Sequence, residues 1–483
     1  MKVFYFSVVL FIALFMPFMT REELFVVTPG LACVYLVFWL YSKLRQSDQK
    51  IPVFDVGMFC ALVTLIYSVY PLMNYWVGEF DFGIFGDGRL TAYKPSAAEI
   101  GFFHLRHVLY LSFFVLFYKM FRGNGVIKAG KIDQPSRGTT QVVVAVFIFL
   151  TGYFFVLQMV TGLNFNHGYD SGAVGGKLEV VASAPLVLVQ ISGKLAGILT
   201  VFKLALLYIV INRCKRRKWL IILFLWIAAE VVMMVVIKGA RAGTFLFILA
   251  AVLLYHRIIK EFSMKFLISS GILSFVFFLF LGLYRSFNDI SSMQLEYVQA
   301  GVGYLSGTNN EFQSMLGTAY DVYQRKMAGA DIPWYLYIND IVAILPPQQL
   351  LPFEKVDASE WYLRELGLSG TGQGYMWGVI SQSIVGFDWV ELALRGSLLG
   401  FFLAQVHRWY TKNQSGFFAT ILYLYLILNC YYTFRNTTGS IFTFIVWEFF
   451  PFYFIVLLGI SLGRSSSGNQ TRLIYVVPAK ISE

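Results

Sequence analysis

The chain has 483 residues, of which 58% are hydrophobic and only 13% are charged. Soluble domains carry about 25% charged residues, so this composition excludes an ordinary soluble protein. The net charge of +11 does not indicate nucleic-acid binding, because the basic residues gather in short loops between apolar runs. These runs, each of about 18 or more residues, predict an all-α polytopic protein in a lipid bilayer.

About twelve membrane spans are predicted. Residues 1–19 resemble a signal peptide behind Lys2, but no small-x-small cleavage site precedes Thr20, so we expect an uncleaved first helix. The other spans are expected near residues 24–41, 53–77, 99–121, 140–161, 195–212, 219–237, 243–256, 266–284, 389–406, 416–434 and 440–462.

Basic clusters follow alternate spans, and Arg213–Lys218 is the strongest of them. The positive-inside rule therefore predicts that both termini are cytoplasmic. The predicted organisation is nine spans in residues 1–284, a large outer loop at 285–387, three spans in 388–463 and a tail at 464–483. The sequence shows no paired repeat of the kind that many transporters carry, which disfavours a transporter.

The large outer loop is the only long polar segment, and loops of this length are usually functional. We interpret it as a partly helical cap over an active site. Helical spacing of apolar residues predicts an amphipathic helix at 311–327, and a capping box at 357–360 precedes a helix that Gly367 ends. The aromatic stretch 334–345 is too short to span a bilayer. Its tyrosines and tryptophans suit either sugar stacking or the headgroup layer.

Glycine recurs at positions 370, 372 and 374 near the end of this loop. Such a run gives either a flexible hinge or a backbone that approaches a phosphate closely. The spacing does not decide between the two.

Three arginines at outer span ends run against the positive-inside bias, namely Arg241, Arg285 and Arg435. Each could simply extend to lipid phosphates. If they converge, their guanidinium groups would instead form a clamp suited to a diphosphate.

Several other ionisable residues lie near predicted span ends. His104 and His107 share a face of the fourth span, where they either pack or act as a base. His167 lies in an outer loop, where it could contact sugar. Glu391 and Arg395 are spaced to pair with each other, which favours a structural role for Arg395. The four cysteines lack metal-ligand spacing, so neither a disulfide framework nor a zinc site is expected.

The second half of the chain resembles the Wzy-type O-antigen or oligosaccharide repeat-unit polymerases. The resemblance rests on about twelve spans and on short motifs at Gly239–Gly243, Tyr284–Ser286, Gly372–Tyr375 and Gly386–Phe387. The family often has a glutamate in the helix before the last motif, where this chain has Ser381 and Gln382. Asp388 stands where glycine is usual.

The resemblance implies a metal-independent, inverting glycosyltransferase without a cofactor. It would polymerise undecaprenyl-diphosphate-linked oligosaccharide repeat units into O-antigen or a related surface polysaccharide, at the periplasmic face of the bacterial inner membrane. Arg241, Arg285 and Arg435 would be catalytic, holding the diphosphate, and a polysaccharide chain-length regulator is a candidate partner. The candidate substrate-binding residues are Lys238, His104, His107, His167, Tyr284, Gly372, Gly374 and Tyr375.

Two alternatives remain open. A flippase for the same lipid-linked sugars should have short loops and charge inside the bundle at mid-membrane, whereas here the charge is expected at the outer edge. An O-antigen ligase would share the architecture and the outer arginines. It would differ in its acceptor, which is the lipid A core.

Overall fold

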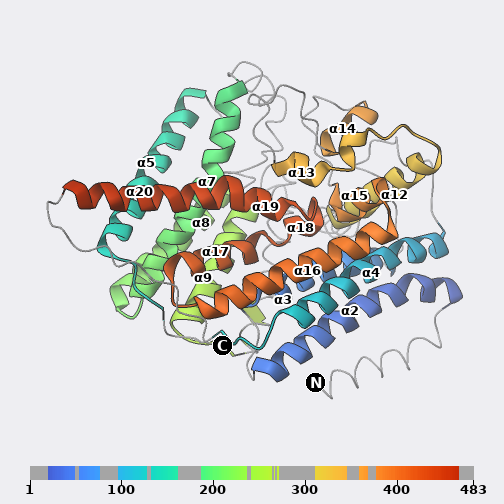
Figure 1. The fold of residues 1–483 in the computed structure, drawn as a ribbon, viewed down its shortest axis with the longest axis horizontal. Coiled ribbons are helices and arrows are strands. Elements are labelled where there is room, and N and C mark those ends of the chain that lie inside the picture. The colour runs from blue at the N-terminus through green and yellow to red at the C-terminus, as the bar shows by residue number, and fades with distance from the viewer. Residues whose placement is uncertain are drawn as a thin grey trace, which may run out of the picture.

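The computed structural model describes residues 20–48, 54–76, 96–127, 132–161, 186–236, 241–263, 266, 269–270, 311–344, 358–367 and 377–466. Every regular element within these ranges is a helix (Figure 1). The longer helices are α2 (Arg21–Asp48), α3 (Val56–Trp76), α4 (Ala97–Phe121), α5 (Arg137–Thr161), α7 (Leu186–Arg213), α8 (Arg217–Val236), α9 (Arg241–Ile258), α16 (Trp389–Lys412), α17 (Phe417–Asn429) and α20 (Phe450–Ser466).

Six helical stretches are long and apolar enough to cross a bilayer, which indicates a helical membrane protein. They are Arg21–Gln46, Ala97–Phe121, Arg137–Leu157, Lys194–Arg213, Trp389–Lys412 and Ser440–Leu462. Each predicted span within the described ranges falls on a helix or on consecutive helices. The span predicted at 1–19, and nearly all of that at 266–284, lie outside the described residues, so the number twelve stays a prediction.

The two last predicted spans are interrupted helices. α17 has 13 residues, about 20 Å, and α18 (Tyr432–Arg435) follows after a break. Side chains compete for backbone carbonyls at this break, since the Thr433 hydroxyl donates to Cys430 O at 2.6 Å and Asn429 Nδ2 to Tyr425 O at 2.9 Å. The final span consists of α19 (Ser440–Phe444), a π-helical turn η5 (Ile445–Phe449) and α20.

Helices α2, α4 and α16 lie side by side and run in the same direction (Figure 1). Glycines allow their backbones to touch, as in small-xxx-small packing in membranes. A Cβ added at Gly396 would lie 2.5 Å from Tyr110 O, and one added at Gly400 would lie 2.5 Å from Phe114 O. The residue numbers of the contacting pairs rise together on both helices, so α4 and α16 are parallel. The predicted alternation of span directions requires the same relation.

Buried charges join the ends of α3, α4 and α16 on the predicted cytoplasmic side. Asp55, which directly precedes α3, is 1% exposed, and its carboxylate accepts hydrogen bonds from Tyr118 at 2.8 Å and from Arg122 Nε at 3.1 Å. His407 Nδ1 lies 3.5 Å from the same carboxylate. The three helix ends are therefore fixed to one another by polar contacts within the bundle.

Short helices from the predicted outer loop gather near the start of α4 (Figure 1). They are α12 (Glu311–Met327), η3 (Trp334–Leu336), α13 (Asn339–Ile344), α14 (Ala358–Glu365) and α15 (Gly378–Val385). The predicted amphipathic helix is confirmed as α12, which buries Met315, Leu316 and Ala319. The predicted end of α14 at Gly367 is also confirmed, with φ +68° there.

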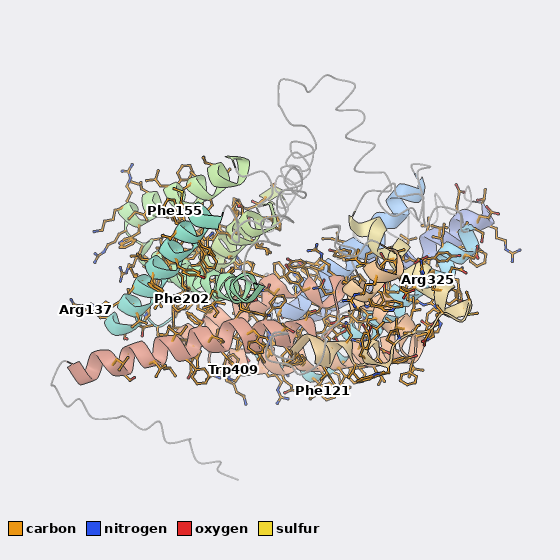
Figure 2. The ribbon with its side chains drawn as sticks, turned by 90° about the horizontal axis from the view of Figure 1, so that it is seen from above. Phe121, Arg137, Phe155, Phe202, Arg325 and Trp409 are labelled. Atoms are coloured by element: carbon orange, nitrogen blue, oxygen red, sulfur yellow. The ribbon has the colours of Figure 1, made fainter. Side chains whose placement is uncertain are left out.

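A lysine joins α12 to α15. Lys326, at the end of α12, donates to the carbonyls of Ile384 at 2.6 Å and Gly386 at 2.8 Å, which are otherwise unsatisfied at the end of α15. Figure 2 shows α12, marked by Arg325, on the opposite side of the molecule from α5 and α7, marked by Phe155 and Phe202. The predicted hinge glycines at 370–374 lie outside the described residues.

The backbone contact between α4 and α16 predicts a position-specific effect of adding one methyl group. Gly400→Ala should lower the unfolding free energy by about 1–3 kcal/mol, because its Cβ would overlap Phe114 O. Gly152→Ala in α5 is the matched control, since a Cβ there meets nothing within 4 Å. Thermal unfolding in detergent measures both variants, and equal midpoints would contradict the close contact.

The predicted orientation can be tested with single cysteines at two exposed sites, Asp331 and Lys215. Asp331→Cys should react with a membrane-impermeant maleimide in intact cells, and Lys215→Cys only after permeabilisation. Background is low because the four native cysteines are all buried. Reaction of Lys215→Cys in intact cells would show that the predicted orientation is wrong.

Candidate functional site

The turn that carries Arg435 inserts into the helical bundle. Phe434, on α18, is fully buried, and its ring lies 5.5 Å from the His107 ring, 5.6 Å from the Tyr110 ring and 5.5 Å from the Tyr67 ring. Because His107 and Tyr110 lie near the middle of α4, the turn reaches below the level at which α4 begins. Arg435 is itself partly exposed.

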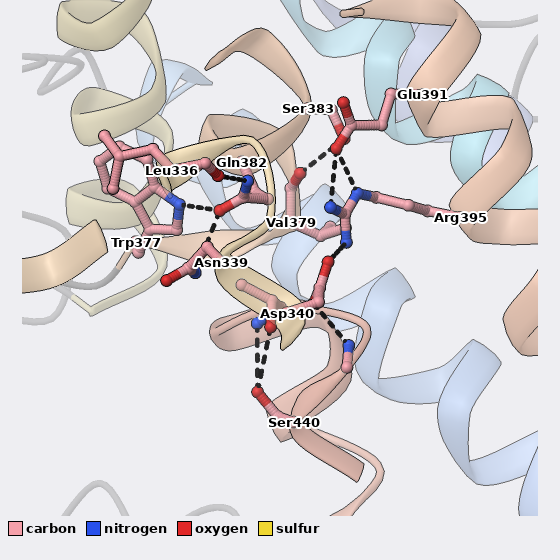
Figure 3. A network of polar contacts seen from close by, with 12 residues as sticks. Leu336, Asn339, Asp340, Trp377, Val379, Gln382, Ser383, Glu391, Arg395 and Ser440 are labelled. Atoms are coloured by element: carbon pink, nitrogen blue, oxygen red, sulfur yellow. Dashed lines mark hydrogen bonds and ion pairs between the residues drawn. The ribbon is translucent and has the colours of Figure 1, made fainter. Parts of the chain in front are cut away.

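A chain of charges links this turn to the helices of the predicted cap (Figure 3). Gly439 N donates to Asp340 Oδ1 at 2.8 Å, and Asp340 also pairs with Arg395. Arg395 Nη2 in turn lies 2.7 Å from Glu391 Oε1, so the predicted pairing of Glu391 with Arg395 is confirmed. Arg395 thereby fixes α13 against α16 and the Arg435 turn.

The Gln382 side-chain amide forms three hydrogen bonds to neighbouring groups (Figure 3). Its Oε1 accepts from Asn339 Nδ2 at 3.1 Å and from Trp377 Nε1 at 3.0 Å, and its Nε2 donates to Leu336 O at 2.7 Å. This buried neutral side chain therefore joins α13, η3 and α15. It is a structural hub and supplies no acid.

Aromatic rings connect Arg435 to a carboxylate in the last span. The Arg435 guanidinium lies 5.9 Å from the Tyr432 ring, and that ring lies 4.8 Å from the Phe444 ring. Phe444 lies 6.4 Å from the Tyr425 ring, and the Tyr425 hydroxyl donates a hydrogen bond to Glu448. We call these five residues the Arg435–Glu448 cluster.

Glu448 lies in the π-helical turn η5, facing α7. A Cβ added at Gly197 would lie 2.2 Å from its carboxylate carbon, so only glycine allows this approach. Lys194, one turn before Gly197, places its ammonium 5.7 Å from the Trp447 ring. Sequence analysis missed Glu448, although it is the one charged residue between Ser440 and Leu462 and an ionisable residue within a span is a signal for function.

We expected the charged side chains at the outer edge of the bundle, and this expectation was wrong. Lys203 Nζ, in the middle of α7, lies 2.6 Å from Glu230 Oε1 on α8. Trp226 Nε1 also donates to Glu230 at 3.2 Å, and the Lys203 ammonium lies 4.6 Å from the Phe247 ring. The two charges are tolerated inside the bundle because they neutralise each other.

The end of α9 contacts the start of α17. At the end of α9, Arg257 Nη2 donates to Gln414 O at 3.1 Å, just before α17 begins. The Arg241 side chain, at the start of α9, lies outside the described residues, so its place relative to Arg435 stays a prediction. Other predicted site residues lie outside the described part of the chain, namely Lys238, His167, Tyr284, Arg285, Gly372, Gly374 and Tyr375.

His104 and His107 share a face as predicted, with stacked rings whose centroids lie 4.5 Å apart. Both are fully enclosed in the bundle, at 0% and 1% exposure. A substrate contact for either one therefore stays a prediction. Among the described residues, no group of three or more His, Cys, Asp or Glu side chains could hold a metal ion.

No protein-family model, curated protein or solved structure matches this chain.

An outer ion pair joins α4 to the start of α16. Arg106 donates to both carboxylate oxygens of Asp388, at 2.8 and 2.7 Å, and its guanidinium lies within 4.6 Å of the Phe103 and Trp389 rings. Asp388 adopts φ 49° and ψ −113°, a conformation that favours glycine. The bidentate pair compensates for this strained backbone.

Two substitutions at Asp388 should separate the contribution of the ion pair to stability from the cost of the strained backbone. Asp388→Ala loses the pair and keeps a side chain in a glycine conformation, whereas Asp388→Gly loses the pair but relieves the backbone. We expect Asp388→Gly to be more stable than Asp388→Ala by about 1 kcal/mol, and both to be less stable than the parent. Chemical unfolding in detergent gives this order, and equal stabilities for the two variants would show that the conformation is not strained.

Proposed function

We propose that the chain is a membrane-embedded glycosyltransferase that polymerises undecaprenyl-diphosphate-linked oligosaccharide repeat units at the outer face of a bacterial inner membrane. The observation that carries the proposal is the Arg435 turn. This turn presents a partly exposed arginine below the helices of the predicted cap. Asp340, which is paired with Arg395, holds the turn in place by accepting a hydrogen bond from Gly439 N.

The chemistry requires a clamp for a leaving diphosphate. An acceptor hydroxyl attacks the anomeric carbon of the growing chain, the bond from that carbon to the diphosphate oxygen breaks, and negative charge develops on the diphosphate. The Arg435 guanidinium can donate two parallel hydrogen bonds to this group as its charge grows. Arg241 and Arg285 are expected to complete the site.

The reaction also needs an acceptor for the hydroxyl proton. Asp340 and Glu391 are engaged by Arg395, and Asp388 is engaged by Arg106. Glu448 differs from these three, because its carboxylate accepts a hydrogen bond from the Tyr425 phenol and its neighbouring cation is Lys194 rather than an arginine. The proposal therefore assigns the proton to Glu448, at the far end of the Arg435–Glu448 cluster.

A flippase for lipid-linked sugars is the second candidate. The Lys203–Glu230 pair favours it, because paired charges within spans are typical of transport pathways. The polymerase is the better proposal, since the described helices of the large loop are tied to the Arg435 turn. An O-antigen ligase would use the same clamp with a different acceptor.

Purified protein incubated with one lipid-linked repeat unit distinguishes the three. A polymerase gives a ladder of lipid-linked products that grows with time. A ligase gives product only when lipid A core is added, and a flippase moves the substrate across vesicle membranes without altering it. Absence of a ladder from folded protein would overturn the proposal.

Substitutions of Arg435 test the clamp. Arg435→Ala should lower the rate of ladder formation by about 10²–10³, the usual effect of losing one donor to a developing charge. Arg435→Lys should restore little of it, because an ammonium lacks the bidentate fork. Arg408→Ala, at an exposed arginine on the predicted cytoplasmic side, is the matched control and should leave the rate unchanged. A fully active Arg435→Lys variant would favour simple anchoring to lipid.

A further inference from the structure

Helix α13 and the turn η3 that precedes it have an amphipathic polarity opposite to that of a helix in water. Four large apolar or aromatic side chains of this segment are between 38% and 73% exposed and follow one another at helical spacing. We call them the α13 apolar face, which consists of Trp334, Tyr337, Ile338 and Ile341.

Polar contacts hold the opposite side of α13 against the protein (Figure 3). Asn339 is buried, and its Nδ2 donates to Gln382 Oε1 at 3.1 Å. Asp340 accepts from Gly439 N at 2.8 Å and pairs with Arg395. The amide and the carboxylate of α13 therefore point into the protein, and the apolar face is fixed on the outside.

Another helix of the same predicted loop has the ordinary polarity. α12 buries Met315, Leu316 and Ala319, whereas its Gln324 side chain is exposed. This is the arrangement expected of a helix that packs on a protein and faces water. The inverted arrangement in α13 indicates that its outer side meets an apolar medium.

Two spans set the depth of α13 in the bilayer. Arg395, which pairs with Asp340, comes six residues after the start of α16, a distance of about 9 Å along that helix. Trp447 Nε1 donates to Ile344 O, at the end of α13, at 2.9 Å, and Trp447 comes seven residues, or about 10 Å, after the start of the stretch Ser440–Leu462. The hydrocarbon core is about 30 Å thick, so both contacts place α13 within the outer half of the bilayer.

The α13 apolar face lies beside an exposed apolar stripe of α16. Val390, Leu394 and Leu398 recur at every fourth position of α16, and each is more than half exposed. Leu394 directly precedes Arg395, and Ile341 directly follows the Asp340 with which Arg395 pairs. A span exposes such a stripe to acyl chains, so the neighbouring face of α13 meets the same medium.

We propose that η3 and α13 form an interfacial helix of the outer leaflet, with the α13 apolar face against the acyl chains of bilayer lipids. Trp334 and Tyr337 carry one polar group each on an apolar ring, which suits the headgroup level. Ile338 and Ile341 then lie deeper, toward the contact with Trp447. This assigns the aromatic stretch to the membrane rather than to sugar stacking, and it does not depend on the proposed function.

Spin labels on single cysteines test this contact in the full-length protein reconstituted into phosphatidylcholine vesicles. Ile341→Cys is the test position, Leu394→Cys on α16 is the reference for lipid, and Asp331→Cys is the reference for water; all three positions are exposed. The four native cysteines are buried, so label attaches mainly at the introduced position. Relaxation of the label by oxygen, which concentrates among acyl chains, is compared with its relaxation by a water-soluble nickel chelate.

The ratio of oxygen to nickel relaxation at Ile341→Cys should match that at Leu394→Cys and exceed that at Asp331→Cys at least several-fold. A ratio equal to that at Asp331→Cys would overturn the proposal, because the face would then meet water and be open to sugar. Protection from both reagents would also contradict it, since protein would then cover the face.

Two substitutions of Ile338 give a second test that needs no label. Ile338 directly precedes α13, a position at which aspartate caps a helix in water. If the face meets water, Ile338→Asp should be at least as stable as Ile338→Ala, which loses the same packing. If it meets lipid, the carboxylate is costly, and we expect the thermal unfolding midpoint of Ile338→Asp in vesicles to lie a few degrees below that of Ile338→Ala. A midpoint for Ile338→Asp at or above that of Ile338→Ala would show that the face does not lie in lipid.

Discussion

The backbone contact between α4 and α16 is the constraint on which the rest of the structure depends. Gly396 and Gly400 allow the two helices to approach until a methyl group would not fit. At one end the Arg106–Asp388 ion pair joins the two helices, and at the other end Asp55, which is paired with Arg122, lies 3.5 Å from His407 of α16. Van der Waals packing drives helix association in lipid, so close contact stabilises this pair where hydrophobic burial cannot.

This rigid pair positions the candidate site. α16 carries Arg395, which holds Asp340 and through it the Arg435 turn, so the depth of that turn is set from α16. α4 supplies the other wall, where polar groups replace the apolar side chains usual in a span. The Arg435 turn is thus held by Asp340 and Arg395 on one side and packs against the His107 and Tyr110 rings of α4 on the other.

The sequence was informative wherever a local pattern carries the signal. Hydropathy located the spans that fall within the described residues, helical spacing located α12, and the positive-inside bias singled out Arg435 for its unusual place. Long-range partners were not predictable, since Arg106 and Asp388 are 282 positions apart. The break after α17 was also missed, because hydropathy measures how apolar a segment is and not whether its helix is continuous. Arg285 and the glycine run stay predictions, as they lie outside the described residues.

The π-helical turn at Glu448 divides the last span into two half-helices with different neighbours. An α-helix advances about 100° per residue, so the wider turn rotates all later side chains relative to the earlier ones. Glu448 approaches Gly197 on α7, while Gly459 approaches Val142 on α5. Deleting one residue from the turn would restore a regular helix, yet it could satisfy only one of these contacts. The irregular turn is therefore what allows a single span to serve two helix interfaces and still direct a carboxylate into the protein.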